Sequence, residues 1–262
     1  MPFATHEAQI VADGSIVLTA APGVARTIRL PDMAGLFDRR PPGLMRIAGA
    51  DLANAGLLLD DSGWRAVVLP SLGDLASDLG PGAVAIRADG RRAAVVHDGA
   101  VFELELPGAA TTRLEAADAP GALAYAADGS LITAFGAGLG GAGSEGSTIV
   151  ALVAAASAPT ALACHADGSC SVWDTDSRER LGSWTPAIPG PLSISLSPDG
   201  EHATLGTPFA ESAAACVVRT VDGATVRHID GARTIALHPA GTGMLVGGEW
   251  GALWLEPPRE AA

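Results

Sequence analysis

The strongest constraint on this chain is a hairpin pattern that returns along its length. Each copy has an apolar strand, a tight turn that ends in glycine, and a second strand that usually stops at proline. Glycine supplies the positive φ angle that such a turn requires, so each copy predicts a β-hairpin. The copies that can be laid over one another cover residues 16–32, 56–71, 93–108, 161–176 and 244–258.

The spacing of the turn glycines predicts how many hairpins there are. These glycines are Gly23, Gly63, Gly99, Gly168 and Gly251, at intervals of 40, 36, 69 and 83 residues. The last two intervals are about twice the first two, so one further hairpin is expected inside each. We place one where LITAF (131–135) joins STIVALV (147–153), and the other where HATLG (202–206) joins AACVVRTV (214–221). Seven hairpins result.

Each hairpin belongs to a longer unit. A short strand and an Asp-Gly type of turn precede most hairpins, and a fourth strand follows some of them, as at 111–115. Four antiparallel strands in roughly 40 residues are typical of a β-propeller blade. We therefore predict an all-β, seven-bladed β-propeller of four-stranded antiparallel blades, with six blades as the alternative.

The whole chain, 1–262, is predicted to be one propeller domain. The chain is short after its last hairpin, so the last blade has either three strands or a closing strand from residues 1–5. A second blade, near residues 148–160, is also expected to be trimmed. The approximate blade bounds are 7–40, 41–78, 79–118, 119–155, 156–189, 190–231 and 232–262.

Two turns carry a resemblance to the WD-repeat propellers. Residues 167–174, DGSCSVWD, resemble that family's Asp-Gly turn followed by a strand that ends in Trp-Asp, and residues 197–200, SPDG, resemble its other characteristic turn. The resemblance implies structural roles for Asp167, Gly168, Trp173, Asp174, Asp199 and Gly200. No Gly-His dipeptide occurs, so the family's buried network of His, turn Asp and Trp is not expected here.

Charge and composition narrow the partners. The net charge is −13 and every basic residue is arginine; such a chain repels phosphate backbones, so nucleic acid is not an expected partner. Three cysteines form no disulfide framework, and their odd number favours reduced thiols and the cytoplasm. We see no export signal and no membrane-spanning segment.

The sequence patterns that resemble catalytic or metal-binding motifs are better explained by structural roles. The glycine-rich stretch 136–141 is followed by a strand pattern instead of a helix, which argues against a nucleotide site. His97 and His165 each stand just before a turn, where they are expected to support the backbone. Cys164 and Cys170 are interpreted as small blade fillers. We predict no catalytic residue, no metal site and no cofactor.

A binding face is the remaining hypothesis for a site. Three aromatic residues lie at or beside hairpin turns: Trp64, Trp250 and Phe209. In the propellers that this chain resembles, turns of this class form a ring around one end of the central channel. With the acidic residues of the same turns they would form an acidic, partly apolar surface; packing between blades is the equally weighted alternative. The acidic members are Asp61, Asp98, Glu211 and Glu249.

The function predicted from these features is a non-catalytic, protein-binding scaffold. A high-GC type of composition suggests a bacterial source, and the propeller is a candidate subunit of a multi-protein bacterial system. The alternative is a hydrolase, such as a lactonase-like enzyme, or a small-ligand binder that works in the central channel.

Overall fold

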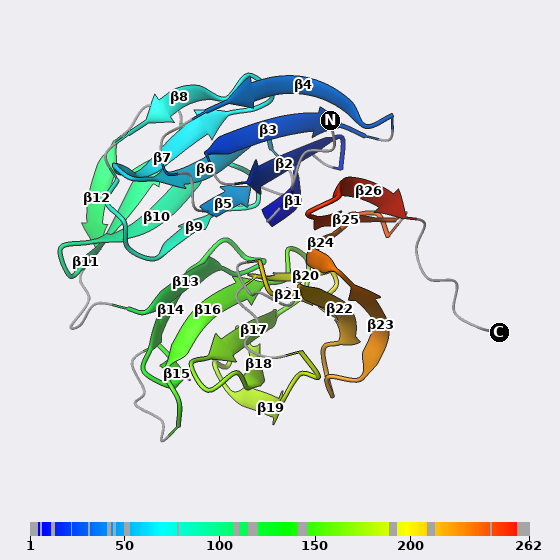
Figure 1. Ribbon diagram of the computed structural model, residues 1–262. Coiled ribbons are helices and arrows are strands. Elements are labelled where there is room, and N and C mark those ends of the chain that lie inside the picture. The colour runs from blue at the N-terminus through cyan, green and yellow to red at the C-terminus, as the bar shows by residue number, and fades with distance from the viewer. Residues whose placement is uncertain are drawn as a thin grey trace.

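A computed structural model shows an all-β protein in which seven antiparallel sheets radiate from a common axis (Figure 1). The structure describes residues 5, 7–11, 14–21, 23–30, 32–40, 43, 46–49, 53–77, 79–106, 110–114, 120–140, 146–188, 193–208, 213–241 and 243–255. Within these ranges there is no helix, and so no helix that is long and apolar enough to cross a membrane. The seven-bladed propeller is confirmed, and the six-bladed alternative is wrong.

The sheets follow one another along the chain as blades 1 to 7, and each strand pairs with the next in sequence. Blade 1 contains β1 (Glu7–Val11), β2 (Ile16–Ala21), β3 (Val24–Arg29) and β4 (Ala34–Arg39). Blade 2 contains β5 (Arg46–Gly49), β6 (Ala55–Asp60), β7 (Gly63–Val68) and β8 (Gly73–Ala76). Blade 3 contains β9 (Val84–Ile86), β10 (Arg92–His97), β11 (Ala100–Glu105) and β12 (Thr111–Leu114).

The second half of the ring includes two thinner sheets. Blade 4 contains β13 (Ala122–Tyr125), β14 (Leu131–Phe135) and the short β15 (Gly138–Leu139). Blade 5 contains β16 (Ile149–Ala154), β17 (Thr160–His165), β18 (Cys170–Asp174) and β19 (Arg180–Trp184). Blade 6 contains β20 (Ser193–Leu196), β21 (His202–Gly206), β22 (Ala214–Arg219) and β23 (Thr225–Asp230). Blade 7 contains β24 (Ala232–Leu237), β25 (Met244–Gly248) and β26 (Gly251–Leu255).

One predicted hairpin is wrong. LITAF, which is β14, pairs with the two residues of β15 and not with STIVALV. STIVALV contains β16, which pairs with β17 and forms the inner strand of blade 5. Blade 4 is therefore the trimmed blade that the sequence indicated in this region. The other inferred hairpin is confirmed, because β21 pairs with β22.

The core is divided among the blades. Among the described residues there are seven buried apolar clusters, and each lies between two neighbouring blades, including one between blade 7 and blade 1. The second strand of a blade is buried on both sides for this reason, as in β2 and β6, all of whose residues are buried. Apolar burial between flat sheets is the main favourable contribution to folding, so the ring must close to be stable.

Closure joins the two ends of the described chain. The inner strand β1 contacts β24 of blade 7, and the amide of Thr5 donates to the carbonyl oxygen of Gly248 at 2.9 Å. The sequence left two possibilities for the last blade, three strands or a closing strand from residues 1–5. The described residues show part of each. Blade 7 has three strands, and Thr5 binds at the end of β25.

Candidate binding face

The turns between second and third strands all lie at one end of the propeller. The first residues of the inner strands lie at this end too, because each inner strand is antiparallel to its second strand. Glu7, Arg46 and Ser193 begin three inner strands and line one cavity together, which shows that these strands enter the axis from the same side. We call this end the hairpin-turn face.

Four of the predicted binding residues are exposed at this face. Asp61 lies in the β6–β7 turn, Asp98 in the β10–β11 turn, and Glu249 and Trp250 in the β25–β26 turn. The side chain of Asp98 is 88% exposed, and Trp250 is 44% exposed. Phe209 and Glu211 lie outside the described residues.

Trp64 occupies a different environment. It is only 6% exposed and belongs to the apolar cluster between blades 2 and 3. Its indole Nε1 donates to the carbonyl oxygen of Gly82 at 2.8 Å, and its backbone amide donates to Gly80 at 2.9 Å. The structure therefore gives Trp64 the packing role that the sequence left as an alternative.

Trp250 owes its position to glycines beneath it. A Cβ atom at Gly248 would come within 2.9 Å of the indole ring, so a side chain there would displace Trp250. Gly251 has a φ of 114°, a value that residues with a side chain rarely adopt. The turn thus holds a large apolar ring half-exposed at the rim of the face.

The charges of the face are partly compensated. Glu249 accepts from Arg233 Nε at 2.7 Å, and Asp98 lies 3.5 Å from His97. Buried Asp60, beside Asp61, pairs with Arg65 at 3.1 Å. Burial acts to raise the pKa of Asp60, but hydrogen bonds from Ser62 and the charge of Arg65 outweigh it and hold the pKa below its ordinary value.

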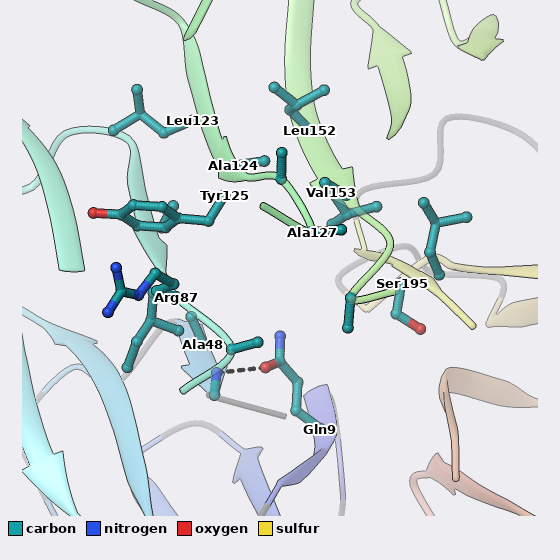
Figure 2. A pocket seen from close by; sticks show the side chains of 18 of the residues that line it. Gln9, Ala48, Arg87, Leu123, Ala124, Tyr125, Ala127, Leu152, Val153 and Ser195 are labelled. Atoms are coloured by element: carbon teal, nitrogen blue, oxygen red, sulfur yellow. Dashed lines mark hydrogen bonds between the residues drawn. The ribbon is translucent and has the colours of Figure 1, made fainter. Parts of the chain in front are cut away.

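Two cavities that described residues line lie along the axis of the ring. One, of about 380 Å³, opens toward the hairpin-turn face, and the other, of about 510 Å³, is lined by the last residues of the inner strands. Figure 2 shows the larger cavity, whose apolar lining consists mainly of alanine, leucine, isoleucine and valine side chains.

Several polar side chains at the larger cavity have hydrogen-bond partners within the protein. Gln9 Oε1 accepts from the amide of Gly49, and Arg87 forms two hydrogen bonds to Asp89, at 2.8 and 2.6 Å. Tyr125 donates to Glu103 at 2.9 Å, and burial together with this bond raises the pKa of its hydroxyl. Among the described residues, no three His, Cys, Asp or Glu side chains gather as a metal site requires.

Glu7 connects blades 1 and 2 at the other cavity, a contact that the sequence did not predict. Its carboxylate is almost fully buried and accepts from Arg46 Nε at 2.9 Å and from the amide of Ile47 at 2.7 Å. Burial raises the pKa of this carboxyl above 4.5, although Arg46 and Ile47 act in the opposite direction.

This shift predicts a pH dependence of stability. An acid whose pKa is higher in the folded state stabilises the fold fully below its unfolded pKa of 4.5, and this contribution is lost as the pH rises through the folded-state pKa. We expect wild type to lose stability relative to Glu7→Gln as the pH rises from 4 to 7. The loss is about 1.4 kcal/mol for each tenfold difference in the proton affinity of Glu7 between the folded and unfolded states. Urea unfolding of both proteins across this range measures it; a difference that is constant with pH would contradict the prediction.

The turn residues implied by the resemblance make local hydrogen bonds. Asp167 accepts from the amide of Ser169 at 2.9 Å, Asp174 from the amide of Ser177 at 2.8 Å, and Asp199 from the amide of Glu201 at 3.0 Å. Gly168 and Gly200 have φ angles of 85° and 75°. Each of these five residues contributes to the shape of its own turn.

Blade 5 also contains a buried network that the sequence pattern does not predict. Ser171 Oγ lies 2.7 Å from His165 Nε2 and 2.7 Å from Trp173 Nε1. His165 Nδ1 lies 2.7 Å from the carbonyl oxygen of Ser147. That carbonyl can only accept, so His165 Nδ1 donates to it, and the Trp173 indole N–H donates to Ser171 Oγ. With a neutral imidazole, Ser171 Oγ donates to Nε2. The signal was the placement of His165, Ser171 and Trp173 on the two strands of one hairpin.

Comparison with family models and with curated proteins finds no match for this chain. Its class is therefore defined by the fold itself, a seven-bladed β-propeller. Its best-exposed candidate site is the hairpin-turn face, with Asp61, Asp98, Glu249 and Trp250.

Proposed function

We propose that the chain is a non-catalytic scaffold that binds a protein partner through the hairpin-turn face. The observation that carries this proposal is the half-exposed Trp250, which lies in the same turn as the exposed Glu249, on a face that also presents Asp61 and Asp98. Exposed aromatic rings are the residues most often responsible for binding energy in protein interfaces. The acidic surroundings favour a partner with a basic surface.

Position-specific photo-crosslinking in cells of the native host tests this proposal. A photoreactive residue at Asp98 should capture a discrete partner, and one at Val221 should not. Val221 is the matched control, because it is 71% exposed but lies in the β22–β23 turn at the opposite end of the propeller. Capture from Val221 alone would place binding elsewhere.

The captured partner should depend on Trp250. Truncation of an aromatic anchor costs about 2 kcal/mol or more, so Trp250→Ala should weaken binding of the purified partner by roughly 30-fold. Leu181→Ala is the control, since Leu181 is 64% exposed on the outer strand β19. Equal affinities of the two variants would count against an anchor at Trp250.

The proposal also includes a family relationship, a cellular compartment and a place in a larger assembly. The Asp167–Asp174 hairpin, together with the His165–Ser171–Trp173 network of the same blade, supports a relationship to WD-repeat propellers. We further propose a cytoplasmic protein of bacterial type that is a subunit of a larger assembly. The absence of lysine and the odd number of cysteines support these assignments.

The channel is the second candidate site, because its larger cavity of about 510 Å³ falls within the size range of small-ligand sites. Hydrolysis of lactone or ester substrates by the purified chain, at a rate that survives Trp250→Ala, would favour this alternative over the scaffold.

A further inference from the structure

Blade 7 ends in a strand whose outer side no described strand covers. β26 pairs with β25 on one side only, and Figure 1 shows it at the outer edge of its sheet. The equivalent third strands of blades 1, 2, 3, 5 and 6 each pair with a fourth strand as well. An uncovered edge presents backbone donors and acceptors that a further strand can bind.

The hairpin register identifies these backbone groups. Gly248 and Gly251 close the β25–β26 turn, so the backbone groups of Gly251, Leu253 and Leu255 face β25. Those of Ala252 and Trp254 therefore face outward. Blade 3 supports this alternation of inward and outward backbone groups. Its turn closes between His97 and Ala100, so Glu105 faces outward, and its amide donates to the carbonyl oxygen of Ala110 at 2.9 Å.

The side chains at this edge are apolar. Leu253 is 50% exposed, whereas Leu255 on the same side of the strand packs into the cluster between blades 6 and 7. Ala252 and Trp254 pack on the other side, against the cluster between blades 7 and 1. A strand added to β26 would cover Leu253 and extend both clusters outward.

We propose that β26 accepts an extended segment of another polypeptide, apolar and basic in composition, which completes blade 7 as its fourth strand. Four backbone hydrogen bonds are on offer, two from the N–H groups and two to the C=O groups of Ala252 and Trp254. A net charge of −13 on each chain opposes pairing between two copies and favours a basic segment. This site is on the rim of the disc and is independent of the hairpin-turn face.

Amide hydrogen exchange of the purified, full-length protein tests whether the edge is open. The amides of Ala252 and Trp254 should exchange about 100-fold faster than those of Val101 and Glu103, their counterparts in blade 3, which β12 covers. Slow exchange in the monomer would show that the chain covers its own edge. Slow exchange that accompanies a dimer would show that a second copy occupies it. Either result overturns the proposal.

A synthetic peptide tests whether the edge accepts a strand. The probe is residues 34–40, AGLFDRR, capped at both ends, because it contains β4, the fourth strand of blade 1, and has a net charge of +1. At saturation it should slow exchange at Ala252 and Trp254 by about tenfold or more, without affecting Val101. No change at these two amides would overturn the proposal.

Two variants assign the binding to β26. Leu253→Lys places a positive charge beside the basic peptide and should weaken its binding about tenfold, whereas Leu181→Lys, an equally drastic change on exposed β19, should not. Ala252→Pro removes one outward N–H and no bond to β25, and should have a similar effect to Leu253→Lys. Unchanged peptide affinity in both β26 variants would overturn the proposal.

Discussion

Trp64→Ala should lower the free energy of unfolding by about 3–5 kcal/mol, the usual cost of truncating a buried tryptophan. The indole is 6% exposed and packs between blades 2 and 3 with Leu57, Leu59 and Leu104. The truncation leaves a cavity at an interface between two blades, and it also leaves the carbonyl oxygen of Gly82 without the indole donor. Equilibrium unfolding in urea, followed by circular dichroism, measures the loss.

Trp250→Ala is the matched control for this experiment. Trp250 is 44% exposed, so its truncation should change the free energy of unfolding by less than about 1 kcal/mol. The same chemical change would then separate the two residues that the sequence grouped in one face: one supports the ring, and the other is free to bind. Equal losses in both variants would contradict the environments described for them.

The fold was predictable from sequence because its signal is local. A tight turn such as His97–Ala100, with positive φ at Asp98 and Gly99, forces the flanking strands to pair whatever the rest of the chain does. Because that hairpin recurs at regular intervals along the chain, the sequence predicts a ring of blades. Where the third strand shrinks to the two residues of β15, the local signal disappears, and β16 was consequently paired with the wrong neighbour.

The candidate site was only partly predictable, since exposure depends on distant residues. Trp64 looks exposed in the sequence because it follows a turn, but the β8–β9 connection folds across it and binds it through Gly80 and Gly82. The Glu7–Arg46 pair joins residues 39 positions apart, and no spacing rule indicates it. Asp61, Asp98 and Trp250 lie in turns between paired strands, and the local hairpin pattern of the sequence indicates those turns.

Ser171→Ala should destabilise the protein by roughly 2–4 kcal/mol, because it leaves two buried polar groups without partners, each at a cost of about 1–3 kcal/mol. Ser171 is fully buried, and its hydroxyl joins the Trp173 indole N–H to His165 Nε2. Alanine removes the hydroxyl that accepts from the Trp173 indole and pairs with His165 Nε2. The expected loss comes from unpaired hydrogen-bonding groups, since the change in volume is small.

Ser195→Ala provides the same chemical change where the loss should be small. Ser195 Oγ lies 2.7 Å from Thr204 Oγ1, but Thr204 also donates to Ile235 O, and Ser195 lines the channel, so neither residue is left isolated. We expect a loss below about 1 kcal/mol for this control. In Ser171→Ala, but not in Ser195→Ala, the Trp173 indole N–H should also exchange faster with deuterated water. Equal stability losses in the two variants, or an unchanged exchange rate at Trp173, would show that the hydrogen-bond network of His165, Ser171 and Trp173 does not stabilise the blade.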